Sequence, residues 1–344
     1  MKAKNISCRL PSRRKFIITI FVKASYRKTL LLLALFLLLS SLTPAEPLRA
    51  QGNPPTVDAL GIYETNHTSA VTSTTPLTEY AVKVTVSDAD TLANLSTVKV
   101  TIFYDTDADN DPADVPGSGD TQNAAVLTCT VGATPSWQID AGTGASWVLV
   151  EANCIQPPLT GTSGDWWFHF KPGKVATEAA DWDAYAVADD GGGTPGTRYD
   201  SSGYDMNWYG EVVVNTGTIN FGSVTLGSDF SSNKVTSISV TYISNGAYSE
   251  QVKSSSSWGT APDQVTLNAS GSPGAGEFSL KANDTDTIAS AVLVSSAGYT
   301  TFDSGTQTAE GGNTESANTI WLKLANSGIP AVAYSGTVYF QIAQ

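Results

Sequence analysis

The chain has 344 residues, of which 32 are acidic, 19 are basic, 3 are Cys and 2 are His. This composition excludes a small disulfide-stabilised domain, a coiled coil and a polytopic membrane protein. Residues 1–50 hold 10 of the basic residues and one acid, so residues 51–344 keep 9 basic and 31 acidic side chains, a net charge of −22. Such an acidic surface repels phosphate and anionic lipid, which argues against a nucleic-acid partner and against membrane attachment through basic patches.

The first 50 residues have the pattern of an export signal. Nine basic side chains precede the apolar run Leu30–Leu39, which is shorter than the roughly 20 residues that span a bilayer. Proline and small residues then lead to a cleavage site near Ala50. General secretion is the preferred route, and the twin-arginine-like stretch Ser12–Ile17 is the alternative. The sequence thus predicts a secreted, extracellular or cell-surface protein with no integral membrane segment after cleavage.

Two cysteines follow the leader, Cys129 and Cys154. An even number of cysteines in an oxidising compartment predicts one disulfide between them. Closing a separation of 25 residues contributes about 3.5 kcal/mol in the chain-entropy description, less any strain. The alternative is a pair of unbonded buried thiols.

Alternating side-chain polarity dominates residues 77–210. Apolar residues occupy every second position in Tyr80–Val86, Val98–Tyr104 and Trp166–Phe170, and these segments are rich in Val, Thr, Tyr and Trp. We also expect strands over 124–131, 146–152, 182–188 and 208–214, separated by turns rich in Gly, Pro, Asp and Ser. Short, regularly spaced strands of this kind are typical of an antiparallel β-sandwich.

A second series of strands is expected over 218–221, 235–243, 248–252, 264–267, 278–282, 291–294, 320–324 and 337–342. Asn245-Gly246 lies between two of them and predicts a type I′ hairpin turn. Asp and Glu number 21 in residues 51–210 and 10 in residues 211–344. The predicted organisation is therefore all-β, with a leader at 1–50, an N-terminal extension at 51–76, an acidic sandwich at 77–210 and a second sandwich at 211–344.

Short motifs in both sandwiches point to a known class of module. In residues 77–210 they are Val86–Asp90, Phe168–Gly173 and Tyr185–Gly191, and in residues 211–344 they are Ile219–Val224, Trp321–Leu324 and Tyr334–Tyr339. With these motifs the first sandwich resembles the immunoglobulin-like modules (PKD and cadherin-like) of prokaryotic surface proteins. The second is similar to C-terminal sandwich modules of secreted surface proteins. The resemblance implies tandem immunoglobulin-like modules with an extracellular structural or adhesive role.

A run of acidic residues marks the candidate metal site. Asp105, Asp107, Asp109 and Asp111 alternate along one loop, and no Lys or Arg lies between residues 99 and 171. Carboxylates this close repel one another, by about 4 kcal/mol at 4 Å and a surface-like dielectric, so they favour a counter-ion. Calcium binds six to eight oxygens and is the expected cofactor; the alternative is a solvated loop without metal. Counting strand directions brings a second pair of acids toward this loop. That pair is Asp189 and Asp190.

Signals for catalysis are weak. The two histidines that follow the leader show no metal-binding spacing, and His169 alternates with Trp167 on a strand face, where we expect it at the surface. No nucleophile elbow or phosphate-binding loop occurs, so we expect a protein that is not an enzyme. Exposed aromatic rings offer a weak carbohydrate-binding alternative. The candidates are Trp167, which is adjacent to Trp166, and Trp208.

The interpretation is an extracellular or cell-surface structural or adhesive protein without catalytic activity. Its partners would be other surface proteins, cell-wall or extracellular polysaccharide, or copies of itself. One alternative is a self-assembling filament or surface-layer subunit, in which the strand-like segment Val57–Tyr63 completes the sheet of a neighbouring copy. The other alternative is a carbohydrate-binding module.

Overall fold

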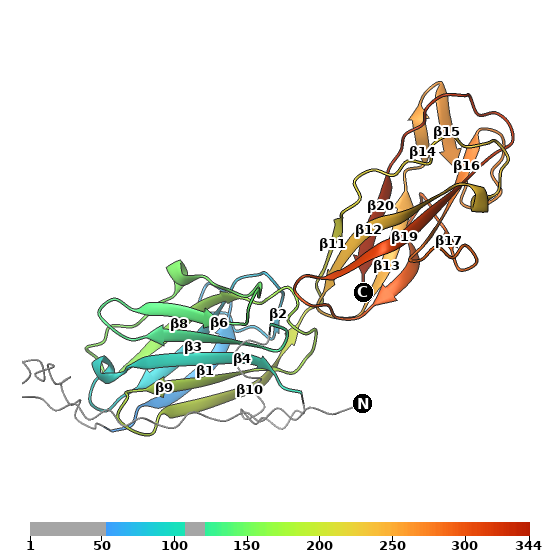
Figure 1. The fold of residues 1–344 in the computed structure, drawn as a ribbon. Helices are drawn as coiled ribbons and strands as arrows, with labels where there is room; N and C mark the ends of the chain where they lie inside the picture. The colour runs from blue at the N-terminus through green and yellow to red at the C-terminus, as the bar shows by residue number, and fades with distance from the viewer. Residues whose placement is uncertain (1–52, 107–120) are drawn as a thin grey trace, which may run out of the picture. The chain divides into compact units, whose positions relative to one another are not determined.

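The computed structural model describes residues 53–106 and 121–344, and these residues form an almost entirely β structure (Figure 1). The leader and its cleavage site lie outside the described residues, as do Asp107, Asp109 and Asp111. Two hydrophobic cores are present. One is built from residues between Val57 and Met206, and the other from residues between Ile238 and Ile342. We call the corresponding parts of the chain the first and the second sandwich.

The first sandwich packs a four-stranded sheet on a six-stranded sheet. The smaller sheet has the order β1 (Thr56–Tyr63), β3 (Tyr80–Ser87), β8 (Ser163–Lys171) and β7 (Val148–Leu149). The larger has the order β2 (Ser73–Thr74), β10 (Gly196–Met206), β9 (Trp182–Asp189), β4 (Thr97–Tyr104), β5 (Ala124–Thr130) and β6 (Ser136–Asp140). All pairs are antiparallel except β2 with β10. Two short 3₁₀ turns, η2 (Leu92–Asn94) and η4 (Glu151–Asn153), lie in its loops.

The predicted alternation builds the first core. Val82, Val84 and Val86 of β3 are fully buried, as are Trp166 and Phe168 of β8, which pairs with it. Successive side chains of a strand point to opposite faces, so one apolar residue in two suffices to cover an inner face. Burying each of these side chains stabilises the fold by about 1.5–3 kcal/mol before entropy is counted.

The segment predicted to be a free N-terminal extension is part of the first sandwich. Strand β1 pairs with β3 from Thr56↔Ser87 to Tyr63↔Ala81, with one bulge after Val57. The phenol of Tyr204 on β10 also accepts a hydrogen bond from the Ile62 amide at 3.1 Å. The prediction of an extension over 51–76 is therefore wrong for its strand. This pairing within its own domain weakens the alternative in which Val57–Tyr63 completes the sheet of a neighbouring copy, and β1 stands at the edge of its sheet.

The second sandwich has a seven-stranded and a three-stranded sheet. The larger sheet has the order β11 (Gly210–Val214), β12 (Lys234–Ser244), β19 (Asn313–Leu324), β16 (Glu277–Asn283), β15 (Asp263–Leu267) and β14 (Ser257–Thr260), with β17 (Val292–Leu293) also paired to β16. The smaller sheet has the order β18 (Thr300–Gly305), β13 (Tyr248–Ser254) and β20 (Val338–Ala343). Only β15 and β16 pair in parallel. A 3₁₀ turn, η5 (Phe230–Ser232), precedes β12.

The hairpin predicted at Asn245-Gly246 is wrong. Strands β12 and β13 on either side of it belong to different sheets, and neither residue has a positive φ. Asn245 is instead fully buried, and its amide donates to the backbone oxygens of Ala176 and Asn207 at 2.9 Å each. Its side-chain oxygen accepts from the Tyr209 amide at 2.7 Å. The residue satisfies buried backbone groups where the chain changes sheets, a task that the local turn signal does not reveal.

Other strand predictions fail where loops replace strands. Residues 218–221 form no strand, and most of 146–152 is loop apart from β7. Within residues 53–106 and 121–344 there is no helix with the length and apolar composition that crossing a membrane requires.

Candidate functional site

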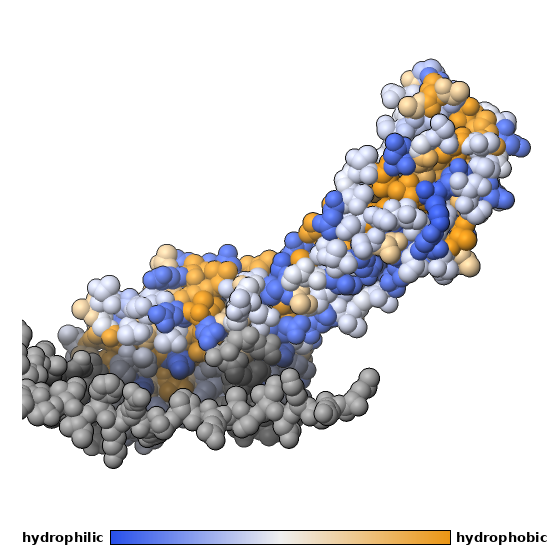
Figure 2. Space-filling model, in the orientation of Figure 1, coloured by the Kyte–Doolittle hydropathy of each residue, from blue (hydrophilic) through white to orange (hydrophobic). Residues whose placement is uncertain are grey.

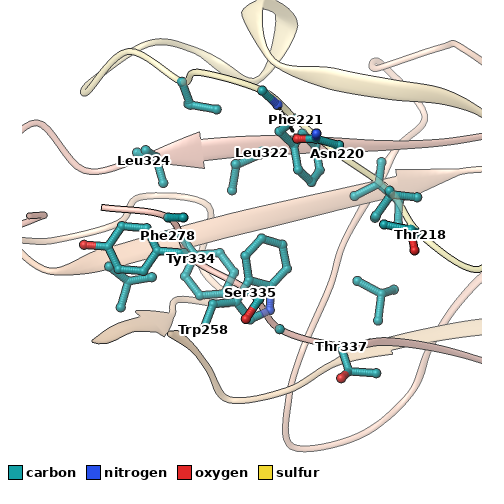
Figure 3. A pocket seen from close by; sticks show the side chains of 18 of the residues that line it. Thr218, Asn220, Phe221, Trp258, Phe278, Leu322, Leu324, Tyr334, Ser335 and Thr337 are labelled. Atoms are coloured by element: carbon teal, nitrogen blue, oxygen red, sulfur yellow. Dashed lines mark hydrogen bonds between the residues drawn. The ribbon is translucent and has the colours of Figure 1, made fainter. Parts of the chain in front are cut away.

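The second sandwich contains an open cavity of about 1060 Å³. Its walls come from the inner face of the larger sheet and from two loops, residues 215–233 and 325–337 (Figure 3). Figure 2 shows hydrophobic residues gathered on the surface over the part of this sandwich where Figure 1 labels β14, β15 and β20. The cavity is therefore a hollow in the apolar core that reaches the surface.

The cavity arises because the two sheets have unequal widths. The three strands of the smaller sheet cover only part of the larger one, and the two loops spread over what is left. Loops of this length without regular structure are uncommon in compact domains and often carry function. Gly336 lets the second loop pass against Trp258, because a Cβ at Gly336 would lie 1.7 Å from the indole ring.

Aromatic rings form the deep wall. Trp258 of β14 lies 4.5 Å from Phe278 of β16 between ring centroids, and Phe221 lies 6.3 Å from the same indole. Phe278 is fully buried, whereas Leu324 of β19 is half-buried beside the opening. Figure 3 shows the labelled aromatic and leucine side chains bordering one shared space.

The lining is apolar or hydroxyl-bearing apart from the carboxamide of Asn220. It contains no Asp, Glu, His, Lys, Arg or Cys, and Tyr334 is its one titratable side chain. The Tyr334 phenol donates to the Pro330 carbonyl at 2.8 Å, and burial together with the nearby Asp263 raises its pKa. General acid–base and nucleophilic catalysis need a group that titrates near neutral pH or an activated nucleophile. The cavity can therefore bind an apolar group but offers no residues for such chemistry.

Among the described residues of the predicted calcium site, Asp105 does not meet the pair Asp189 and Asp190. Strands β4 and β9 are antiparallel neighbours, with Thr97 opposite Asp189 and Tyr104 opposite Trp182. Asp105 follows the end of β4, so Asp189 and Asp190 lie at the opposite end of this strand pair. The prediction that they approach Asp105 is wrong. Strand β6, which the sequence pattern missed, reverses the count of strand directions.

Asp105, Asp189 and Asp190 each make hydrogen bonds close to their own position in the fold. Asp189 accepts from the Gly191 amide at 2.7 Å and Asp190 from the Gly192 amide at 2.8 Å, so both cap their own turn. Asp105 is buried, and its amide donates to the Asp181 carbonyl at 2.9 Å. Burial and the charge of Asp105 raise the pKa of Asp183, against hydrogen bonds to its carboxylate that lower it.

The disulfide predicted between Cys129 and Cys154 is not present in the structure, where both residues are thiols. The Cys129 sulfur is buried in the first core, 4.0 Å from Gln156 Oε1. The Cys154 sulfur accepts from the His169 amide at 3.3 Å and donates to the Val150 carbonyl at 3.6 Å. Burial raises the pKa of Cys129 to about 12 and that of Cys154 to about 11.

The two candidate sugar-binding tryptophans lie in different settings. Trp167 is half-buried, and His67 stacks on it with a centroid distance of 4.1 Å and an interplanar angle of 19°. Trp208 packs against the second core and donates to the Ala247 carbonyl at 3.1 Å. The Trp167 ring already carries a stacked partner, and of the two only Trp208 packs against a hydrophobic core.

His169 is buried, which corrects the prediction of a surface residue. Its Nδ1 lies 2.8 Å from Glu79 Oε1, and its Nε2 lies 2.8 Å from His67 Nε2. Burial and His169 lower the pKa of His67. The loop that carries His67 folds over the strand face and covers His169, a long-range event that the strand alternation does not show.

No protein-family model matches the chain, and no curated protein matches it. Among solved structures, the chain is similar to the C-terminal domain of the antigen I/II polypeptide BspA of Streptococcus agalactiae, at 11% identity over 84% of this chain and 96% of that one, with a TM-score of 0.21. A C-terminal fragment of the major pilin GBS80 of the same species matches at 8% identity over 83% and 91%, with a TM-score of 0.22. The C-terminal domain of the antigen I/II-family protein AspA of Streptococcus pyogenes matches at 10% identity over 84% and 95%, with a TM-score of 0.19.

Proposed function

We propose that the chain is an exported structural or adhesive protein without catalytic activity, and that its second sandwich binds an apolar group of a partner in the cavity. The observation that carries this proposal is the lining, which contains aromatic and aliphatic side chains and no acid, base or thiol. Filling such a hollow contributes free energy in proportion to the apolar area removed from water. A partner could thus be held without any bond being made or broken.

The first 50 residues and the acidity of the remainder support an extracellular or cell-surface location. The basic and apolar pattern before Ala50 is that of a secretory signal, and the net charge of −22 over residues 51–344 keeps the exported part away from anionic surfaces. Partners in this setting are other surface proteins, extracellular polysaccharide or copies of the chain itself.

The chemistry of the cavity favours a protein partner over a sugar. Stacking on a sugar ring needs an open aromatic face, but Trp258 is 8% exposed and Phe278 is fully buried. An apolar lining of this kind can bind an aliphatic or aromatic side chain inserted from a partner surface, as at the centre of protein interfaces.

The cavity can be tested with a neutral apolar probe, N-phenyl-1-naphthylamine, whose fluorescence rises in apolar surroundings. Leu324→Trp places an indole in the opening and should abolish saturable binding to residues 51–344, which form one compact unit. Val213→Trp is the matched control, because Val213 is 43% exposed and does not line the cavity. Equal binding by both variants, or no binding by the unchanged chain, would exclude the cavity as a binding site.

The location requires its own experiment. Protease added to intact cells of the source organism should degrade the chain, while a cytoplasmic marker stays intact. Full protection of the chain until the cells are lysed would contradict the extracellular assignment.

A further inference from the structure

Three acidic side chains converge between the two sheets of the second sandwich. Glu250 of β13 and Asp303 of β18 are opposite each other in the smaller sheet, and Glu315 projects from β19 of the larger sheet. One carboxylate oxygen of each lies within 4.8 Å of the other two. None of these residues lines the apolar cavity, so the cluster is a separate feature.

Glu250 is fully buried, and no described residue meets hydrogen-bond geometry with either of its carboxylate oxygens, although the Glu315 carboxyl and the Tyr242 phenol are close enough to shift its pKa through hydrogen bonding. It stands on the inner face of β13, between the buried residues Tyr248 and Val252. None of the ion pairs among the described residues involves Glu250, Asp303 or Glu315. A charged carboxylate in such a place costs several kcal/mol unless something compensates its charge.

The phenol of Tyr242 points to the same place from the larger sheet. Tyr242 is fully buried, and its oxygen meets hydrogen-bond geometry with no described residue. Burial and the charges of Glu250 and Glu315 raise its pKa, and a hydrogen-bonding interaction with Glu250 raises it further. One oxygen of Glu315, Oε2, is likewise buried without a partner. Buried polar atoms are normally satisfied, so several such atoms around one point call for an ion, a water molecule or a proton that completes them.

We propose that Glu250, Asp303 and Glu315 bind a hard divalent cation such as Ca²⁺ between the two sheets, with the Tyr242 oxygen beside it. The donor set consists only of oxygen, which suits calcium or magnesium better than zinc or copper. Asp303 and Glu315 are half-buried, so the site has a side open to solvent from which an ion and its remaining water ligands could enter. The ion would join β13 and β18 to β19 and so tie one sheet to the other.

The rival explanation is that protons, not a metal, remove the charge. Burial and Glu315 raise the pKa of Glu250 to about 9, so a protonated Glu250 is the state expected without metal. The two explanations differ in one respect. A metal site binds and is stabilised by calcium at neutral pH, whereas a protonated cluster is indifferent to it.

Terbium luminescence, sensitised by nearby tyrosine rings, measures the binding directly on residues 51–344. We expect a saturable signal that calcium displaces, with a dissociation constant on the order of 10⁻⁴ to 10⁻³ M for calcium as in other extracellular modules. Glu250→Gln and Asp303→Asn should each weaken binding more than about 10-fold, the size of effect that even outer-shell substitutions reach. Asp263→Asn, an exposed acid of the same sandwich, should leave it unchanged.

A second acidic segment requires a separate control. In a triple variant with Asp107, Asp109 and Asp111 all changed to Asn, the signal should persist. A signal that disappears in this variant and survives Glu250→Gln would overturn the proposal, as would the absence of any signal from the unchanged chain. Asp303→Asn alters a half-buried residue and keeps the test valid if Glu250→Gln does not fold. The absence of cation binding would not affect binding of the apolar probe by the cavity, because the two sites share no residue. The cation-site proposal and the proposed function are therefore tested independently.

Discussion

Truncating Phe278 tests whether the cavity exists in solution. Phe278 and Phe168 are a matched pair, because each is fully buried within a strand and contacts an indole, Trp258 at 4.5 Å and Trp137 at 5.1 Å between ring centroids. They differ in that Phe278 lines the cavity and Phe168 does not. Phe→Ala in a core costs about 3–5 kcal/mol, and the upper part of that range comes from the new void.

At Phe278 one side of the ring already faces a hollow, so less packing is lost. We expect Phe278→Ala to cost about 3 kcal/mol and Phe168→Ala about 5 kcal/mol in the free energy of opening. Hydrogen–deuterium exchange of the amides in β16 and β8 measures these two values within the same chain. Equal costs near the higher value would mean that Phe278 is enclosed on all sides, and the reasoning that places a binding cavity there would be refuted.

Three further predictions concern other parts of the chain. Burial raises the pKa of Cys129 from 9.0 to about 12. At pH 8 iodoacetamide should therefore label this thiol about 1000-fold more slowly in the folded chain than in the unfolded chain, as measured by mass spectrometry. Similar labelling rates would contradict the burial of Cys129. The pKa of His67 is lowered by burial and a neighbouring histidine, so the folded state binds its proton less well than the unfolded state, and stability should fall as the pH drops below the unfolded value of 6.5. The melting temperature should therefore fall more between pH 7 and pH 5 in the unchanged chain than in His67→Gln, and parallel profiles would exclude this role. A Cβ at Gly305 would lie 2.2 Å from the buried ring of Tyr248, whereas one at Gly298 meets nothing within 4 Å. Gly305→Ala should therefore lower the free energy of unfolding by about 1–3 kcal/mol, as measured with denaturant, and Gly298→Ala should leave it almost unchanged. Equal unfolding midpoints for the two variants would show that the Tyr248 ring can move.

The sandwiches were predictable where local alternation determines burial. Val82, Val84 and Val86 are all fully buried, as their spacing predicts. Strand β6 alternates as well, with Trp137 and Ile139 packed against the first core between exposed polar residues, and it pairs with β5. It has only five residues and two inward side chains, so its pattern is short, and it was not among the predicted strands. Because this strand was missed, the predicted direction of β9 relative to β4 was reversed, and Asp189 was predicted at the wrong end of the sheet.

The two candidate sites differ in how visible they were. The cavity joins Phe221 to Phe340, residues far apart in the chain, and no local pattern can show that two loops leave a gap over a sheet. Glu250, in contrast, gave a signal, because it occupies an inward position of the alternating strand Tyr248–Ser254. An acid at a core position breaks the binary pattern and marks either an error or a site. Its partners on β18 and β19 became known only with the fold.

The pairing of β1 also bears on the order in which the first sandwich can assemble. Val84 on β3 pairs with Trp166 on β8, and the amide of Ile62 bonds a phenol 142 residues further along the chain. A chain that emerges from an exporter with its N-terminus first displays β1 and β3 long before those partners are outside. Until then both strands keep open edges that can pair with other chains. For the exported chain that we propose, secretion would have to outpace aggregation, or a holding factor would have to shield the leading strands until residue 206 has passed through.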